Sequence, residues 1–155
     1  MEYRMAGPED IEKMTESRLD TLRAVNCLDK NYRFSEDFTK ACRQYFLEGE
    51  QDTVLALEEE KVVGCATMCY ITLMPTFSHP TGKRAHLMNV YTDPEMRRQG
   101  IARNMVTMLI GAAWQKGATE ISLDATEAGR PLYRSLGFRD SAECMVLERS
   151  GAGEV

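Results

Sequence analysis

The central part of the chain, residues 84–115, reads RAHLMNVYTDPEMRRQGIARNMVTMLIGAAWQ. Its first portion, residues 87–92, is apolar and β-prone, which predicts a buried strand. Pro94 bars continuation of that strand, and a basic loop with a single glycine, Gly100, follows. Apolar residues then recur at helical spacing to about Lys116. The region therefore predicts a strand, a loop and a helix in succession.

Such a succession is suited to binding a phosphate group. The first N–H groups of a helix have no partner inside it, and the helix dipole adds partial positive charge there. Gly100 has no side chain, so an anion can approach the backbone closely. Formal positive charge comes from Arg97, Arg98 and Arg103. Taken alone, the pattern equally describes a helix start with a solvated basic first turn.

Composition bounds the class of protein. The chain has 155 residues, of which 43% are apolar and 28% charged, as in a soluble protein with one full core. The net charge of -5 argues against general binding to nucleic acids or anionic membranes. No signal-peptide pattern and no apolar stretch of membrane-spanning length is present. We therefore expect a single cytoplasmic domain over residues 1–150, with a tail at 151–155.

The five cysteines lack CxxC spacing and a histidine neighbour at metal-binding distance in the sequence. We expect reduced thiols, with neither a disulfide framework nor a metal site. Three of them fall in predicted strands: Cys65, Cys69 and Cys144.

The remaining pattern predicts strands and helices on both sides of the central region. Predicted strands cover residues 3–5, 53–57, 62–73, 120–125 and 144–149. Predicted helices include one with an apolar stripe of Ile11, Met14, Leu19, Leu22 and Val25, one capped by Ser35 that ends near Glu48, and one from Thr126 or Glu127 to Leu136. A helix joins the strands at 87–92 and 120–125, so these two should be parallel. Trp114 is expected to pack in the core.

Two motifs in this region resemble those of one family. Arg97-x-x-Gly100-x-Ala102 resembles the acetyl-CoA pyrophosphate loop of the GNAT N-acetyltransferase superfamily. Residues 126–138, TEAGRPLYRSLGF, resemble its second pattern, N-x-x-A-x-x-L-Y-x-x-x-G-F. Thr126 and Gly129 stand where Asn and Ala are usual in that pattern. Because both motifs have the expected strand and helix context, residues 84–138 are similar to this superfamily.

The resemblance implies a fold and a reaction. The implied fold is α/β (mixed α+β), with three α/β/α layers and a mostly antiparallel sheet of six to seven strands. Its parallel central pair is splayed at a β-bulge near residues 88–92. The implied reaction moves an acetyl group from acetyl-CoA directly to an amine, without an acyl-enzyme and without a metal. The resemblance implies that the cofactor is bound by Val90, Tyr91, Thr92, Arg97, Arg98, Gln99, Gly100, Ile101, Ala102, Arg103, Thr126 and Tyr133.

The catalytic groups are also implied by the resemblance. Tyr133 matches the tyrosine whose hydroxyl protonates the departing CoA thiolate. Alone, it would equally be a tyrosine that packs a helix. His86 stands where the histone-acetyltransferase branch has a glutamate base, and it could equally be an inert, partly exposed histidine. Asn89, Asp124 and Glu127 are the next candidates, as groups that position water.

The acceptor is expected to be a primary amine of a small molecule or an amino-acid-like compound. In the family, residues equivalent to 18–46 and 73–83 shape its pocket. Acids beside aromatic rings there would suit a small cationic amine; the candidates are Asp29, Glu36 and Asp37 with Tyr32, Phe34, Tyr45, Phe46 and Phe77. Alternatives are acetylation of a protein N-terminus or lysine, and a sensor that binds CoA without turnover. A nucleotide-binding protein of another fold is disfavoured, because neither a P-loop Lys-Ser/Thr nor GxGxxG is present. The protein is expected to be a monomer or homodimer.

Overall fold

The computed structural model describes residues 1–150, which form two compact units. The first unit comprises residues 1–124 and the second begins at residue 125. Whether residues 1–150 act as one domain, as the sequence led us to expect, stays a prediction.

The first unit contains a five-stranded sheet whose strands follow one another in chain order. The strands are β1 (Glu2–Met5), β2 (Gln51–Glu58), β3 (Lys61–Thr72), β4 (Lys83–Thr92) and β5 (Ile121–Leu123). Neighbouring strands are antiparallel except for β4 and β5, which are parallel. The expected sheet, mostly antiparallel with one parallel pair, is therefore confirmed.

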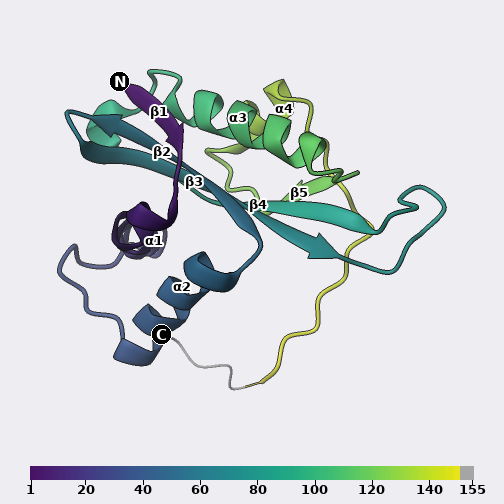
Figure 1. The fold of residues 1–155 in the computed structure, drawn as a ribbon, viewed down its shortest axis with the longest axis horizontal. Coiled ribbons are helices and arrows are strands. Elements are labelled where there is room, and N and C mark those ends of the chain that lie inside the picture. Colours follow the sequence, from purple (N-terminus) through teal and green to yellow (C-terminus); the bar gives the residue numbers. More distant parts are fainter. Residues whose placement is uncertain (151–155) are drawn as a thin grey trace. The chain divides into compact units, whose positions relative to one another are not determined.

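Helices cover both faces of this sheet (Figure 1). α1 (Ile11–Val25) and α2 (Glu36–Glu48) lie on one face, and α3 (Ile101–Gln115) lies on the other. Short 3-10 turns precede α1 (η1, Pro8–Asp10) and follow β4 (η2, Pro94–Met96). The expected three-layer architecture is confirmed. The second unit contains α4 (Arg130–Ser135).

Local chemistry explains where several of these elements begin and turn. Ser35 caps α2, because its hydroxyl oxygen accepts a hydrogen bond of 3.2 Å from the Phe38 N–H. Glu59 and Glu60 both have positive φ, 48° and 68°, which gives the two-residue turn that joins β2 to β3 the twist its strands require. Gly64 lies next to a register shift, and a Cβ there would stand 3.0 Å from the Tyr91 carbonyl oxygen. This close backbone approach favours glycine.

The two faces of the sheet differ in polarity. Apolar side chains without solvent exposure fill the space beneath α3, among them Met105, Val106 and Leu109. The face beneath α1 also buries polar groups, namely Thr15, Ser17 and Thr21. Thr15 and Thr21 donate to helix carbonyls one turn earlier, which satisfies their hydroxyls.

Four sequence predictions about the fold were wrong. Residues 144–149 form no strand within residues 1–150, and Met145 and Leu147 are almost fully exposed. The expected count of six to seven strands was therefore too high, and Cys144 lies outside any strand. Trp114 is half exposed rather than in the core. α4 begins at Arg130, later than Thr126 or Glu127, because residues 127–129 form a turn before it.

Candidate active site

A β-bulge interrupts the pairing of β4 with β3. Cys65 pairs with Tyr91 and Thr67 with Met88, so Asn89 and Val90 both stand opposite Ala66. Asn89 has a φ of 60°, a left-handed conformation that asparagine tolerates better than most residues. A bulge of this kind bends the strand and leaves backbone groups outside the ladder.

The bulge coincides with the point where the parallel pair separates. β4 and β5 pair only from Ala85 with Ile121 to Leu87 with Leu123, whereas β4 continues to Thr92. Within residues 1–150, no strand pairs with β4 on its β5 side over residues 88–92. The expected splay is therefore confirmed. An extended ligand can add to such an open edge by pairing with its backbone.

Buried hydrogen bonds hold the bulge residue in place. The Asn89 side-chain amide donates to the Thr67 hydroxyl at 3.2 Å, and its carbonyl oxygen accepts from Arg18 Nη1 at 3.4 Å. The Asn89 backbone carbonyl accepts from the Cys65 thiol at 3.5 Å. Asn89 is 8% exposed, so its amide serves this network rather than open solvent. The geometry gives Asn89 a positioning role for the bulge.

The segment after the bulge leads into an open helix start. Thr92 Oγ1 is buried and has no hydrogen-bond partner among residues 1–150. Arg97 Nε donates to the Thr92 carbonyl at 3.2 Å. Gly100 caps α3 with a φ of 78°, and a Cβ built on it would meet nothing within 4 Å. The space beside Gly100, at the start of α3, is thus open. This orphaned hydroxyl and open cradle fit a cofactor with an extended arm and a pyrophosphate.

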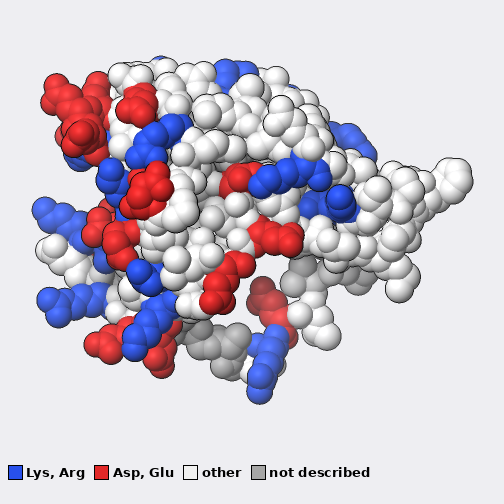
Figure 2. All heavy atoms as spheres, in the orientation of Figure 1, with Lys and Arg blue, Asp and Glu red and all other residues white. Residues whose placement is uncertain are grey.

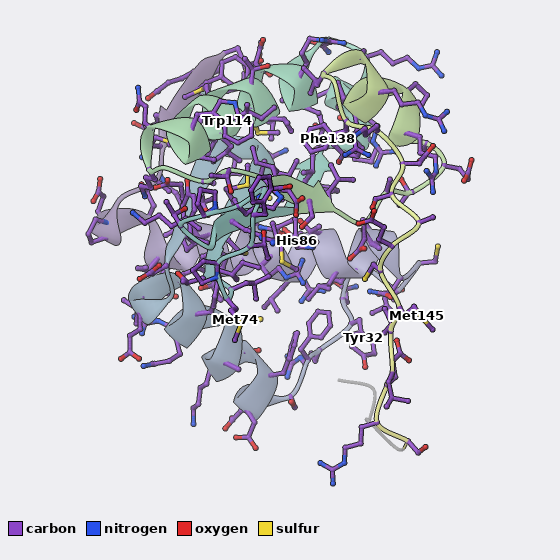
Figure 3. All side chains as sticks on the ribbon, turned by 90° about the vertical axis from the view of Figure 1, so that its right-hand side faces the viewer. Tyr32, Met74, His86, Trp114, Phe138 and Met145 are labelled. Carbon is purple, nitrogen blue, oxygen red and sulfur yellow. The ribbon has the colours of Figure 1, made fainter. Side chains whose placement is uncertain are left out.

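His86 lies on β4 just before the splay. Its Nδ1 is 2.7 Å from the Ser122 hydroxyl on β5, and its Nε2 is 3.6 Å from a carboxylate oxygen of Asp124. Its cross-strand partner is Cys69, so the two side chains share one face of the sheet. His86 is labelled in Figure 3. A histidine with a hydroxyl at one nitrogen and a carboxylate near the other is equipped to accept a proton.

Tyr133 belongs to the second unit, where local packing fixes it. Its ring meets the Phe138 ring edge-on, with centroids 5.9 Å apart. Burial raises the pKa of the Tyr133 phenol, which keeps the hydroxyl protonated. Thr126 Oγ1 accepts from the Gly129 N–H at 3.2 Å and so organises the turn before α4. A Cβ at Gly129 would lie 2.9 Å from the Tyr133 ring, which explains the glycine at this position.

The residues expected to form the acceptor pocket are not gathered into one group. Phe46 packs in a core cluster with Ile11 and Met14, whereas Phe77 is fully exposed. Figure 2 shows the β3–β4 hairpin, which carries Phe77, ending in an uncharged projection. The three expected acids, Asp29, Glu36 and Asp37, are exposed.

Arg18, which the structure brings to the bulge, was not among the site residues predicted from the sequence. A signal was present, because Arg18 follows Met14 by four residues on the helix face that was expected to be apolar. That face is in fact largely polar, and Val25, expected in its stripe, is exposed.

Among residues 1–150, no group of histidine, cysteine or acidic side chains could hold a metal ion. None of the helices that these residues form combines the length and apolar character that crossing a membrane requires.

Comparison with known proteins places the chain in a family. The model of the acetyltransferase (GNAT) family matches residues 13–138. The chain belongs to the GNAT acetyltransferase family. Its fold resembles that of a predicted acetyltransferase from Clostridium acetobutylicum, crystallised with acetyl-CoA, at a TM-score of 0.83 and 28% identity over 95% of each chain.

Sequence relatives match over only part of their length. A glucosamine 6-phosphate N-acetyltransferase from Trypanosoma brucei brucei is 28% identical over 57% of this chain and 58% of its own length. Human N-acetyltransferase 8 is 31% identical over 69% of this chain and 47% of its own length. The match thus spans about half the length of these relatives.

Proposed function

We propose that this protein is an acetyl-CoA-dependent N-acetyltransferase that acts on a primary amine of a small or amino-acid-like molecule. The observation that carries the proposal is the continuous path from the free edge of β4, over residues 88–92, to the open start of α3 at Gly100. Acetyl-CoA, when bound, supplies an activated thioester. A cytoplasmic location is part of the proposal.

The residues of β4 and α3 would hold the cofactor. Backbone groups of Val90, Tyr91 and Thr92 are free to pair with an extended arm, and Thr92 Oγ1 lacks a partner among residues 1–150. The first N–H groups of α3 and the side chains around Gly100 favour a pyrophosphate. An N–H at the bulge would donate to the oxyanion that forms when the amine attacks the carbonyl.

His86 and Tyr133 would move protons. An amine attacks only when it is neutral, so His86, beside Ser122 and Asp124, would accept its proton directly or through water. Tyr133 would return a proton to the departing thiolate. Asn89 would keep the bulge in its shape through its bonds to Thr67 and Arg18.

The first test is ligand-dependent stability followed by turnover. Acetyl-CoA at a hundredfold excess over its dissociation constant should stabilise the protein by about 2.7 kcal/mol, and free acetate should not. A panel of primary amines should then show release of CoA. If acetyl-CoA binds and no amine of the panel is acetylated, the alternative of a sensor without turnover would be favoured. An absence of stabilisation by acetyl-CoA would refute the proposal as a whole.

A further inference from the structure

A half-buried arginine without a counter-ion lies beside the bulge. Arg18 is on α1, and no carboxylate among residues 1–150 forms an ion pair with it. Its one hydrogen bond in this part of the chain joins Nη1 to the Asn89 side chain at 3.4 Å, at the long end of the accepted range. None of the other guanidinium nitrogens is both buried and without a hydrogen-bond partner. Those that lack a partner are therefore exposed to solvent.

The groups around Arg18 carry no compensating charge. Three thiols lie within the influence of its charge: Cys42 on α2 and Cys65 and Cys69 on β3. Burial raises the pKa of each thiol by more than the positive charge of Arg18 lowers it, so all three are neutral at pH 7. Asp20, two positions along α1, is paired with Arg23 at 2.7 Å. A partly desolvated guanidinium among neutral groups attracts an anion from solution.

The position of Arg18 relates this cation to the reacting centre. Arg18 contacts Asn89, and His86 precedes Asn89 by three residues on the same strand, β4. The charge of Arg18 also lowers the pKa of the Cys69 thiol, and Cys69 stands directly across from His86 on the neighbouring strand. One small molecule can therefore place an amine near His86 and an anionic group at Arg18.

We infer that Arg18 selects acceptors that carry an anionic oxyacid group, a carboxylate or a phosphate, close to the primary amine. This inference rests on the proposed function and names the substrate class of the same site. It replaces the cationic acceptor expected from the sequence. A guanidinium fork binds either oxyacid through paired hydrogen bonds, which a lysine cannot reproduce.

The test compares matched acceptors in wild type and Arg18→Gln. Glycine against glycinamide probes a carboxylate, and glucosamine 6-phosphate against glucosamine probes a phosphate. Arg18→Gln should lower kcat/KM for the anionic member of the favoured pair by about 10- to 100-fold more than for its neutral twin. Comparing each pair across the two proteins cancels differences in the intrinsic reactivity of the amines. Arg18→Lys should recover part of the loss.

Arg43→Gln is the matched control, because Arg43 lies on α2 and forms an exposed ion pair with Glu12. It removes the same charge and should leave both members of each pair unchanged. An equal effect of Arg18→Gln on anionic and neutral acceptors, or no effect on either, would overturn the inference while leaving the proposed function intact.

A binding measurement covers acceptors that are not turned over. Calorimetric titrations with and without CoA would compare N-acetylglycine with its amide, and N-acetylglucosamine 6-phosphate with N-acetylglucosamine. At least one anionic product should bind wild type more tightly than its neutral twin, and Arg18→Gln should abolish that preference. Wild type that shows no preference in either pair would also overturn the inference. Failure of acetyl-CoA itself to bind would instead count against the proposed function.

Discussion

The proposed reaction depends most on the Tyr133 hydroxyl, which would protonate the departing thiolate. Tyr133→Phe retains the ring that packs against Phe138, so the fold and acetyl-CoA affinity should survive. It removes the proton donor, and general acid catalysis contributes about 10²- to 10⁴-fold. We expect a loss of kcat in that range, with KM for acetyl-CoA little changed.

Single-turnover rates with a verified acceptor are the proper measurement, because slow product release would hide part of the loss. A variant as fast as wild type in that experiment would show that the proton comes from water. Gly129→Ala offers a second check, since its methyl group would press on the Tyr133 ring without altering the hydroxyl.

His86 can be separated from the other histidine of the chain. His86→Gln should lower kcat and flatten the acid limb of the rate profile, because the proposed acceptor of the amine proton is lost. His79→Gln is the matched control. His79 bonds Thr119 at 2.9 Å and approaches Glu120, away from the splay, so its pH profile should match wild type. Identical profiles for His86→Gln and wild type would remove His86 from the mechanism.

At the scale of elements, α3 offers two glycines, one at its cap and one inside it, whose substitution should change stability in opposite directions. Gly100 has a φ of 78° in open space, whereas Gly111 lies inside α3, also with nothing within 4 Å of a built Cβ. Gly100→Val should strain the cap by about 1–2 kcal/mol and abolish stabilisation by acetyl-CoA, because the side chain fills the cradle. Gly111→Ala should add up to about 1 kcal/mol of stability and leave binding intact.

Thermal shifts with and without acetyl-CoA measure both effects, with the folded fraction of each variant checked by circular dichroism. Undiminished acetyl-CoA affinity in folded Gly100→Val would contradict the assignment of this loop.

Elements were predictable where local chemistry alone decides them. Ser35 as a cap and the glycine before α3 each appear in the structure at the expected place. The bulge at Asn89 was expected from resemblance, since nothing in the spacing of residues 87–92 reveals a positive φ. Arg18 reaches the bulge across 71 positions of sequence, and no local pattern encodes that contact.

The failures at the scale of the whole molecule have one physical cause. Residues 144–149 contain the apolar run 144–147 that suggested a strand, but a strand exists only when its backbone pairs with a neighbour. Trp114 was assigned to the core because large aromatics usually lie there, yet its position on α3 leaves it half exposed. In both cases the structure depends on whether a segment distant in the sequence packs against these residues.

Whole-molecule stability should depend on one buried carboxylate. Asp10 is 1% exposed, accepts hydrogen bonds from the Arg4 guanidinium and the Gly7 N–H, and so ties β1 to the start of α1. The bond from Arg4 is the main reason that the pKa of Asp10 falls to about 2. Since the folded pKa is below the unfolded value near 4, the carboxylate stabilises the fold above about pH 4. That contribution is lost as pH falls from about 4 to about 2.

Asp10→Asn should therefore destabilise the protein at pH 7 by about 1–3 kcal/mol, because Arg4 loses its charged partner. The difference from wild type should shrink as pH falls from about 4 to about 2, where protonation also neutralises the native side chain. Urea unfolding at a series of pH values measures both quantities. Glu12→Gln removes the exposed ion pair with Arg43 and should shift stability by no more than about 1 kcal/mol, which controls for loss of surface charge. A wild-type advantage over Asp10→Asn that persisted undiminished at pH 2 would show that Asp10 acts through shape rather than charge.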